Sequence, residues 1–184
     1  MLPVSVYYED TNASTVLGEF LKEVLRLHDK VLVICIGTDK YICDCIGPLV
    51  GSQLVETNIP LKVFGVLDDP IHSGNFEESI KEITHSFPDY KVIAIDGYLG
   101  KEEEIGVIRF KEGSINPGAA ISKKHSSIGN YAIEAIIEKK EVSDYLLELP
   151  LRLRYIYKMA SIIRDAFKYA YSANDNSNNL KFKI

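Results

Sequence analysis

Apolar residues follow two alternating patterns along the first part of the chain. Residues 13–28 carry them at helical spacing, whereas residues 31–36 (VLVICI) form an uninterrupted and mostly β-branched apolar run. A run of this kind is typical of a strand covered on both faces, as in parallel sheets. The pattern therefore predicts a helix over 13–28 and a buried strand over 31–36.

The alternation continues over the next hundred residues. Further helices are predicted over about 44–57 and 75–86, and further strands over 61–66, 91–96 and 105–111. Pro48 is tolerated in a first helical turn, so the earlier of these helices should begin near 45–47. Strands that alternate with helices build a mostly parallel sheet with helices on both faces. We expect an α/β fold of three layers, α/β/α, with four to five strands.

The last third of the chain combines a long loop with two helical patterns. Residues 113–127 show no period and contain the turn signal Asn116-Pro117-Gly118. Loops of this length in a compact domain are more often functional than idle. Helices are predicted over 128–140 and from Pro150 to about 171. The chain is long enough for one domain over residues 1–184, with a polar tail, 172–184, that is expected to fray.

Composition and charge narrow the class of function. The 184 residues carry a net charge of −5, whereas proteins that bind nucleic-acid backbones are usually basic. No apolar run reaches the roughly 20 residues of a membrane helix, and the first residues do not resemble a signal peptide. Cys35, Cys43 and Cys45 lack the spacing of a secreted disulfide framework. We therefore expect a cytoplasmic protein without nucleic-acid or membrane partners.

Two acidic residues adjoin predicted strands and helices in positions that suit a ligand site. Ligands of open α/β sheets bind beyond the carboxyl ends of the strands, where strand order reverses. Asp44 begins a predicted helix, whose dipole favours its charged form, and Asp96 ends an apolar strand, where desolvation favours its neutral form. Carboxyls with separated pKa values can divide acid and base roles. The structural alternatives are a helix cap for Asp44 and a turn former for Asp96.

Other polar residues lie beyond the predicted strand ends. They are Thr38, Asp39, His72, Asn116, Lys123, Lys124, His125 and Ser126. The glycine fingerprints of dinucleotide and P-loop sites are absent from the sequence, as is the G-x-S-x-G elbow of serine hydrolases. A nucleophilic Cys43 or Cys45 beside His125 would need a lowered thiol pKa, which nothing in the neighbouring sequence suggests. Lys123 and Lys124 could bind an anionic group or lie on a solvated loop.

Three segments resemble motifs of the spore germination protease. Residues 37–50 (GTDKYICDCIGPLV) match its first-site pattern, G-x-x-x-x-x-x-D-x-x-G-P-L-V. Residues 92–96 (VIAID) resemble its second-site strand, which also ends in Asp, and residues 113–118 (GSINPG) resemble its loop T-G-I-x-P-G. The matches occur in the same order. The whole chain is most similar to sporulation proteins of the YyaC type, a family described as candidate spore peptidases.

This resemblance implies a phosphorylase/hydrolase-like fold and a site built on Asp44 and Asp96. The hydrogenase maturation endopeptidases share the scaffold more remotely. In them two acids and a histidine surround a metal that is part of the recognised substrate, and the histidine corresponds to His125 with a one-residue shift. The resemblance also implies the mother cell or forespore of a spore-forming bacterium as the location, and related proteases of this fold can form oligomers.

Three functional hypotheses follow. In the first, the protein is a peptidase in which Asp44 activates a water and protonated Asp96 acts as the acid, with help from His125. The residues expected to contact its peptide or protein substrate are Thr38, Asp39, His72, Asn116 and Ser126. In the second, a non-catalytic sporulation factor binds a peptide or protein partner in the same pocket. In the third, Asp44, Asp96 and His125 hold Zn²⁺ or Ni²⁺; otherwise no cofactor is expected.

Overall fold

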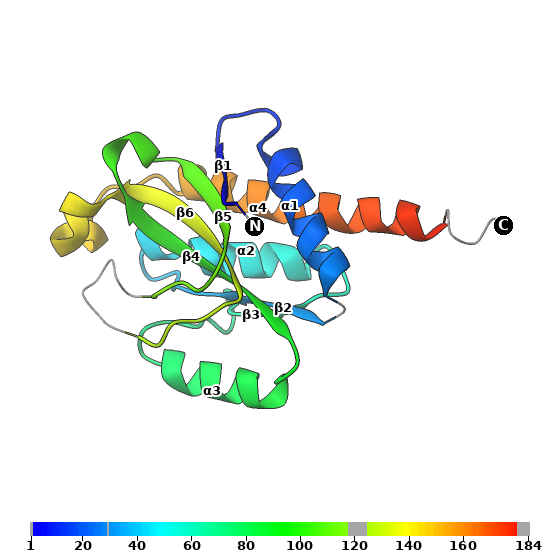
Figure 1. Ribbon diagram of the computed structural model, residues 1–184. Helices are drawn as coiled ribbons and strands as arrows, with labels where there is room; N and C mark the ends of the chain where they lie inside the picture. The colour runs from blue at the N-terminus through cyan, green and yellow to red at the C-terminus, as the bar shows by residue number, and fades with distance from the viewer. Residues whose placement is uncertain (1, 29, 118–124, 180–184) are drawn as a thin grey trace.

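One sheet extends through the molecule, and its strands alternate with helices along the chain (Figure 1). The computed structural model describes residues 2–28, 30–117 and 125–179. Across the sheet the order is β1 (Val4–Tyr7), β5 (Val107–Glu112), β6 (Tyr131–Lys139), β4 (Lys91–Gly100), β2 (Val31–Cys35) and β3 (Lys62–Phe64). Only the two pairings made by β5 are antiparallel among these described strands. The predicted, mostly parallel α/β sheet is confirmed, with six strands instead of four to five.

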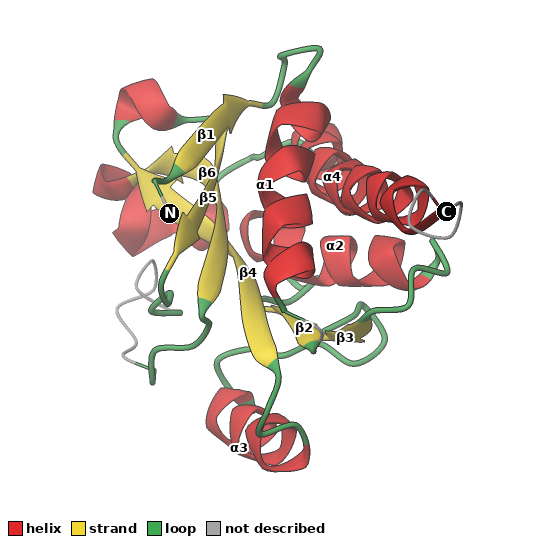
Figure 2. Ribbon diagram, turned by 45° about the vertical axis from the view of Figure 1, so that its right-hand side comes forward, coloured by secondary structure: helices red, strands yellow, loops and turns green. Residues whose placement is uncertain are grey.

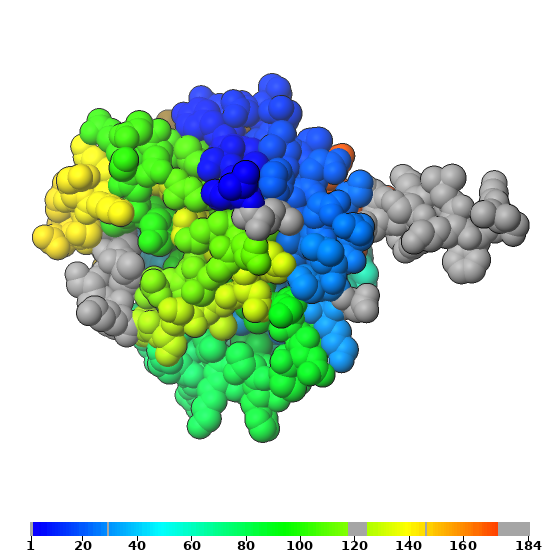
Figure 3. All heavy atoms as spheres, in the orientation of Figure 1, coloured from blue at the N-terminus to red at the C-terminus, as the bar shows by residue number. Residues whose placement is uncertain are grey.

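Helices cover both faces of the sheet (Figure 2). On one face lie α1 (Ala13–Leu27), α2 (Ile46–Val55) and α4 (Leu153–Asn179), and on the other lies α3 (Phe76–Ser86). In the part of the chain that the structure describes, the 3₁₀ segments η1 (Ile42–Asp44), η2 (Glu102–Glu104) and η4 (Lys140–Glu148) connect the main elements. In Figure 3, α3 forms the lower end of the molecule and η4 lies at its left edge. Within the described residues, no helix has an apolar stretch long enough to cross a membrane.

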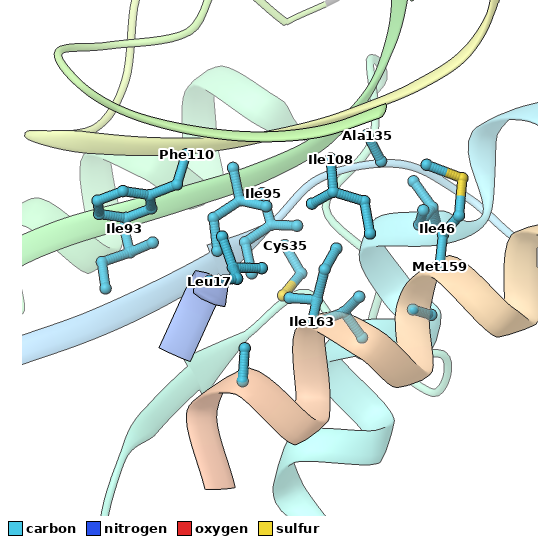
Figure 4. Packing of buried hydrophobic residues seen from close by; sticks show 14 of the residues in the cluster. Leu17, Cys35, Ile46, Ile93, Ile95, Ile108, Phe110, Ala135, Met159 and Ile163 are labelled. Carbon is cyan, nitrogen blue, oxygen red and sulfur yellow. The ribbon is translucent and has the colours of Figure 1, made fainter. Parts of the chain in front are cut away.

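Two apolar clusters hold the three layers together. The larger lies between the sheet and the α1–α2–α4 face and includes Ile93 and Ile95 of β4 and Ile163 of α4 (Figure 4). The smaller cluster packs Ala94 of β4 against Phe76 of α3. Successive side chains of a strand face opposite sides of a sheet, so β4 supplies both clusters. Burial on both faces explains why the predicted strands read as unbroken apolar runs.

The segment 128–140, predicted as a helix, is strand β6, so that prediction is wrong. β6 lies between β4 and β5, and its residues 131–137 are all buried. A strand covered on both faces carries apolar residues without alternation, and such a short run cannot be distinguished from a buried helix by periodicity. The Ala and Glu residues in the run favour a helix locally, but hydrogen bonding to a strand on each side outweighs that preference.

Three further boundaries differ from expectation. Strand β1 was not predicted, because only Val6 of its four residues is buried and it gives too little pattern to recognise. β4 continues beyond Asp96 to Gly100, with a register irregularity between Tyr98 and Leu99. α4 continues to Asn179, through most of the tail expected to fray, while residues 180–184 lie outside the described part.

Two glycines let the end of β2 and the start of α2 approach each other closely. A Cβ added at Gly47 would lie 2.1 Å from the carbonyl oxygen of Ile36. At Gly37, which has a φ of +135°, it would lie 2.0 Å from the carbonyl oxygen of Asp44. No side chain fits at such distances, and positive φ independently favours glycine. The turn after β2 is therefore folded back so that Asp44 lies against the end of the strand.

Gly47→Ala tests this close approach without altering a backbone angle that requires glycine. Because the added methyl would meet backbone rather than a flexible side chain, we expect a loss of about 1–3 kcal/mol in the free energy of unfolding. Urea unfolding followed by circular dichroism measures it. An unchanged midpoint would show that α2 can move away from β2 at no cost.

Candidate active site

A cleft that is partly open to solvent lies at the carboxyl ends of β2 and β4. Within the sheet, β3 lies next to β2 on one side and β4 lies next to β2 on the other, so the strand order reverses at β2. This is the switch point at which α/β sheets bind ligands. The polar side chains that line the cleft include those of Asp44, His72, Asp96, Asn116 and His125.

Asp44 and Asp96 share this cleft, as the sequence analysis required. Asp44 is the last residue of η1, and Asp96 lies inside β4 with its side chain on the same face as α3. The negative charge of Asp44 raises the pKa of Asp96, so the two carboxyls interact electrostatically. The geometry therefore permits the two-carboxyl chemistry, while the catalytic roles of both residues remain predictions.

The carboxyl of Asp96 is held toward its neutral form. The residue is only 7% exposed, and burial is the main reason that its pKa lies well above the ordinary value. The charges of Asp44 and Glu134 raise the pKa further, whereas a hydrogen bond from the backbone N–H of Gly97 opposes them. This agrees with the expectation that desolvation would favour a protonated Asp96.

The expectation that a helix dipole favours the charged form of Asp44 needs correction. Its pKa is raised to about 6 by burial, although a hydrogen bond from the backbone N–H of Thr38 favours the charged form. Asp44 precedes α2, whose N-cap is Cys45, so desolvation outweighs any stabilisation by the helix terminus. Asp96 is the more deeply buried of the two and feels the charge of Asp44, so Asp44 loses its proton first. The predicted order of ionisation is retained for a different reason.

A third carboxyl, Glu134, lies beside Asp96 and was missed from the sequence. It is the register partner of Asp96 on β6, and its side chain is 3% exposed. The Nζ of Lys111 and the guanidinium of Arg109 both contact its carboxylate, from the neighbouring strand β5. These two cations explain how a charged group is accommodated there. The signal in the sequence was a single acid inside the apolar run 131–137.

His125 packs into the wall of the cleft in an asymmetric environment. Its ring lies 5.0 Å from that of Phe76, centroid to centroid, and its Nδ1 lies 3.5 Å from the carboxylate of Glu77. Its Nε2 is buried and has no hydrogen-bond partner in the described part of the chain. His72 differs, because its Nδ1 accepts a hydrogen bond from the backbone N–H of Gly74 at 3.0 Å.

The predicted substrate-contact residues divide into two groups. His72 and Asn116 line the cleft. Thr38 is buried behind it, where its backbone N–H donates to the carbonyl oxygen of Asp44. Asp39 is exposed and is not one of the residues that line the cleft.

Ser126, the remaining predicted contact residue, faces α3. Its backbone N–H and its hydroxyl both donate to the carboxylate of Glu77, at 3.0 and 2.8 Å, and it does not line the cleft. Lys123 and Lys124, considered for binding an anionic group, lie outside the described residues.

The cysteines near the cleft are poor candidates for a nucleophile. Burial raises the pKa of both Cys43 and Cys45 to about 11, and the charge of Asp44 contributes to both shifts. Cys35 is also a free, buried thiol whose pKa is raised by burial. Because the thiolate is the reactive form, these environments oppose cysteine catalysis.

The side chains of the cleft do not form a ready metal site. Over residues 2–28, 30–117 and 125–179, no group of three or more His, Cys, Asp or Glu side chains lies close enough together to hold a metal ion. Asp44, Asp96 and His125 line one cleft but are not such a group.

The fold of the molecule, with a cleft at the switch point of its sheet, is similar to that of a solved protease structure. The solved structure of a [NiFe] hydrogenase maturation protease, HycI from Thermococcus kodakarensis KOD1, matches with a TM-score of 0.51 and 16% sequence identity. The match covers 81% of this chain and 99% of that chain. At this level of identity the likeness shows a shared fold, which the sequence analysis had predicted.

The family follows from the sequence comparisons. The chain belongs to the family described as "Protein of unknown function (DUF1256)", whose model matches residues 5–166. It is also 29% identical over 163 residues to the "Uncharacterized protein YyaC" of Bacillus subtilis (strain 168), covering 87% of this chain and 80% of that protein. The predicted membership of a YyaC-type family is confirmed. The resemblance to the germination protease remains a prediction.

The raised pKa of Asp44 predicts a specific dependence of stability on pH. A carboxyl whose pKa is higher in the folded protein stabilises the fold below its ordinary value of 3.8, and that contribution is lost as pH rises through about 6. Asp44→Asn removes the buried charge. We therefore expect the variant to be more stable than the parent by roughly 1–3 kcal/mol above pH 6, with no gain in acid.

Urea unfolding of both proteins across this pH range measures the difference. Asp39→Asn is the matched control, because Asp39 is an exposed acid in the same turn and its removal should leave stability unchanged at every pH. A destabilised Asp44→Asn protein at neutral pH would contradict the buried, costly carboxylate.

Proposed function

We propose that the protein is a peptidase that hydrolyses a peptide bond with the carboxyl pair Asp44 and Asp96. One observation carries the proposal: two carboxyls with raised pKa values share a solvent-connected cleft at the switch point of the sheet, and they ionise in sequence. As pH rises through about 6, Asp44 becomes a carboxylate, while burial and the new charge on Asp44 favour the protonated form of Asp96. One group can then accept a proton while the other donates one.

The reaction that suits this arrangement is direct attack by water. Asp44 accepts a proton from the water as the water oxygen bonds to the carbonyl carbon, and Asp96 gives its proton to the carbonyl oxygen. As the C–N bond breaks, Asp44 gives the proton it received to the leaving nitrogen, and Asp96 takes back the proton of the hydroxyl that becomes a carbonyl again. Both carboxyls then have their starting protonation. Positioned acid–base groups of this kind accelerate reactions by roughly 10²–10⁴-fold.

The cleft offers both polar and apolar contacts for a polypeptide. Asn116 and His72 provide hydrogen-bonding groups, while Leu99, Ile137 and Leu147 contribute apolar surface that suits an aliphatic side chain. Leu147 is also 43% exposed, so the apolar surface extends to the outside of the molecule. A protein or peptide substrate is therefore favoured over a small charged metabolite.

Two likenesses support this function. HycI has the same fold and is named as a protease. The motifs around Asp44, Asp96 and Asn116 resemble those of the spore germination protease, which supports a spore protein as substrate and the cytoplasm of the mother cell or forespore as the place of action. A sporulation factor that binds a peptide without cleaving it is the alternative use of the same cleft.

The proposal predicts loss of cleavage when either carboxyl is replaced. With an acid-soluble spore protein or a peptide library as substrate, Asp44→Asn and Asp96→Asn should each lower kcat by roughly 10²–10⁴-fold. Asp89→Asn, which removes an exposed acid just before the amino end of β4, should retain full activity. The parent rate should rise as pH increases through about 6, where Asp44 ionises, and fall once Asp96 loses its proton.

Mass spectrometry of the products measures cleavage, and a fluorescent peptide measures binding in parallel. Saturable binding with no turnover in any substrate would replace the peptidase with the non-catalytic binding factor. Restoration of turnover only by added Ni²⁺ or Zn²⁺ would replace the metal-free acid–base pair with a metal site at Asp44, Asp96 and His125. Equal turnover by Asp44→Asn and the parent would reject the carboxyl-pair mechanism.

A further inference from the structure

The two ring nitrogens of His125 have opposite surroundings, and Glu77 accounts for the difference. Nδ1 lies 3.5 Å from the carboxylate of Glu77, in the first turn of α3. Nε2 is buried at the cleft and has no partner in the described residues. A neutral imidazole carries one proton, so the partner of one nitrogen decides what the other can do.

Glu77 is an obligatory acceptor in this contact. The two hydrogen bonds from Ser126 are the largest reason that the pKa of Glu77 is lowered, and the neighbouring His125 lowers it further. Glu77 is therefore ionised at neutral pH, and an ionised carboxylate can only accept hydrogen bonds. The proton of a neutral His125 then belongs on Nδ1, which leaves an unshared electron pair on the buried Nε2.

Glu77 is not needed merely to anchor this loop. The described ends of the loop are already joined by backbone hydrogen bonds in both directions between Ile115 and Ile128, at 2.9 and 3.1 Å. The hydroxyl of Ser127 also donates to Oδ1 of Asn116 at 2.6 Å. The described ends of the loop are therefore held together without Glu77. The contact of Glu77 with the imidazole ring instead influences which ring nitrogen of His125 carries the proton.

His72, on the same cleft, is in the opposite state. Its Nδ1 accepts a hydrogen bond from the backbone N–H of Gly74, so its proton belongs on Nε2. The cleft is consequently lined by one histidine whose Nε2 can donate and another whose Nε2 can accept. A peptide group carries one acceptor, the carbonyl oxygen, and one donor, the N–H.

We propose that Glu77 is a positioning residue that fixes His125 in the Nδ1–H tautomer, so that Nε2 accepts a hydrogen bond from an N–H group of the bound peptide. The peptide as ligand rests on the proposed function; the tautomer does not. His125 contacts the ligand directly, and Glu77 acts through it. Nothing in the sequence pointed to Glu77, because its partners are far away along the chain.

Nitrogen-15 NMR of the protein with labelled histidine, at a pH where histidine is neutral, reads the tautomer directly. The parent should show His125 protonated on Nδ1 and His72 protonated on Nε2, with the signals assigned from His125→Asn and His72→Asn. In Glu77→Gln the new amide can still accept from Ser126 but can also donate to Nδ1. We expect the proton of His125 to move toward Nε2 in that variant, with His72 unchanged.

Glu78→Gln is the matched control, since Glu78 is an exposed acid in the same helical turn and its loss removes the same charge from α3. It should leave the His125 signals at their parent positions. Where the parent cleaves a peptide, Glu77→Gln should lower kcat/KM by roughly 10–100-fold, the usual effect of losing a residue that orients a histidine. Glu78→Gln should keep the parent value.

The outcomes separate the two proposals. An Nε2–H tautomer for His125 in the parent, or the same tautomer in Glu77→Gln as in the parent, overturns the role of Glu77 whatever the activity. The expected tautomers in a protein that cleaves no substrate would establish the role of Glu77 and reject the peptidase. An Nε2–H tautomer of His125 in the parent overturns the proposal even where Glu77→Gln fails to fold.

Discussion

Two carboxyl groups share a mostly buried cleft, and their mutual repulsion governs the chemistry of the site. Burial raises the pKa of each, and the charge of Asp44 raises that of Asp96 further. A second charge becomes costlier once the first is present, so the pair passes through a state with one proton. The close approach of β2 and α2 at Gly37 and Gly47 produces this proximity, because it brings the turn that carries Asp44 against the sheet.

The surroundings of Asp96 further favour the state in which the carboxyl pair holds one proton. A row of residues crosses three strands in register: Asp96 on β4, Glu134 on β6 and Arg109 on β5. Arg109 and Lys111 both form ion pairs with Glu134, whose side chain is only 3% exposed. Neither cation is a cause of the pKa shift of Asp96, whereas the charge of Glu134 contributes to it. Arg109 and Lys111 therefore hold Glu134 in place without lowering the pKa of the neighbouring Asp96.

The predictable part of the fold and site follows from local pattern. Apolar runs predict β2 and β4, and the rule that ligands bind at strand ends selects Asp44 and Asp96 from their positions alone. β6 was predicted as a helix because a strand paired on both sides carries no alternation, and its partners lie elsewhere in the sequence. The raised pKa of Asp44 was missed for a related reason, since its burial is set by side chains from other segments.

Glu77 shows most clearly where sequence reasoning ends. In the chain it is one of two consecutive acids in the first turn of a helix, where the dipole alone explains an acidic residue. Glu78 satisfies that explanation equally well, and only the folded loop distinguishes the two by placing His125 and Ser126 against Glu77. A contact between α3 and a loop beyond β5 depends on the whole sheet being assembled. An acidic residue at a strand, such as Asp96, can thus be found from the sequence pattern. An acidic residue that orients another side chain, such as Glu77, can be recognised only from the tertiary structure.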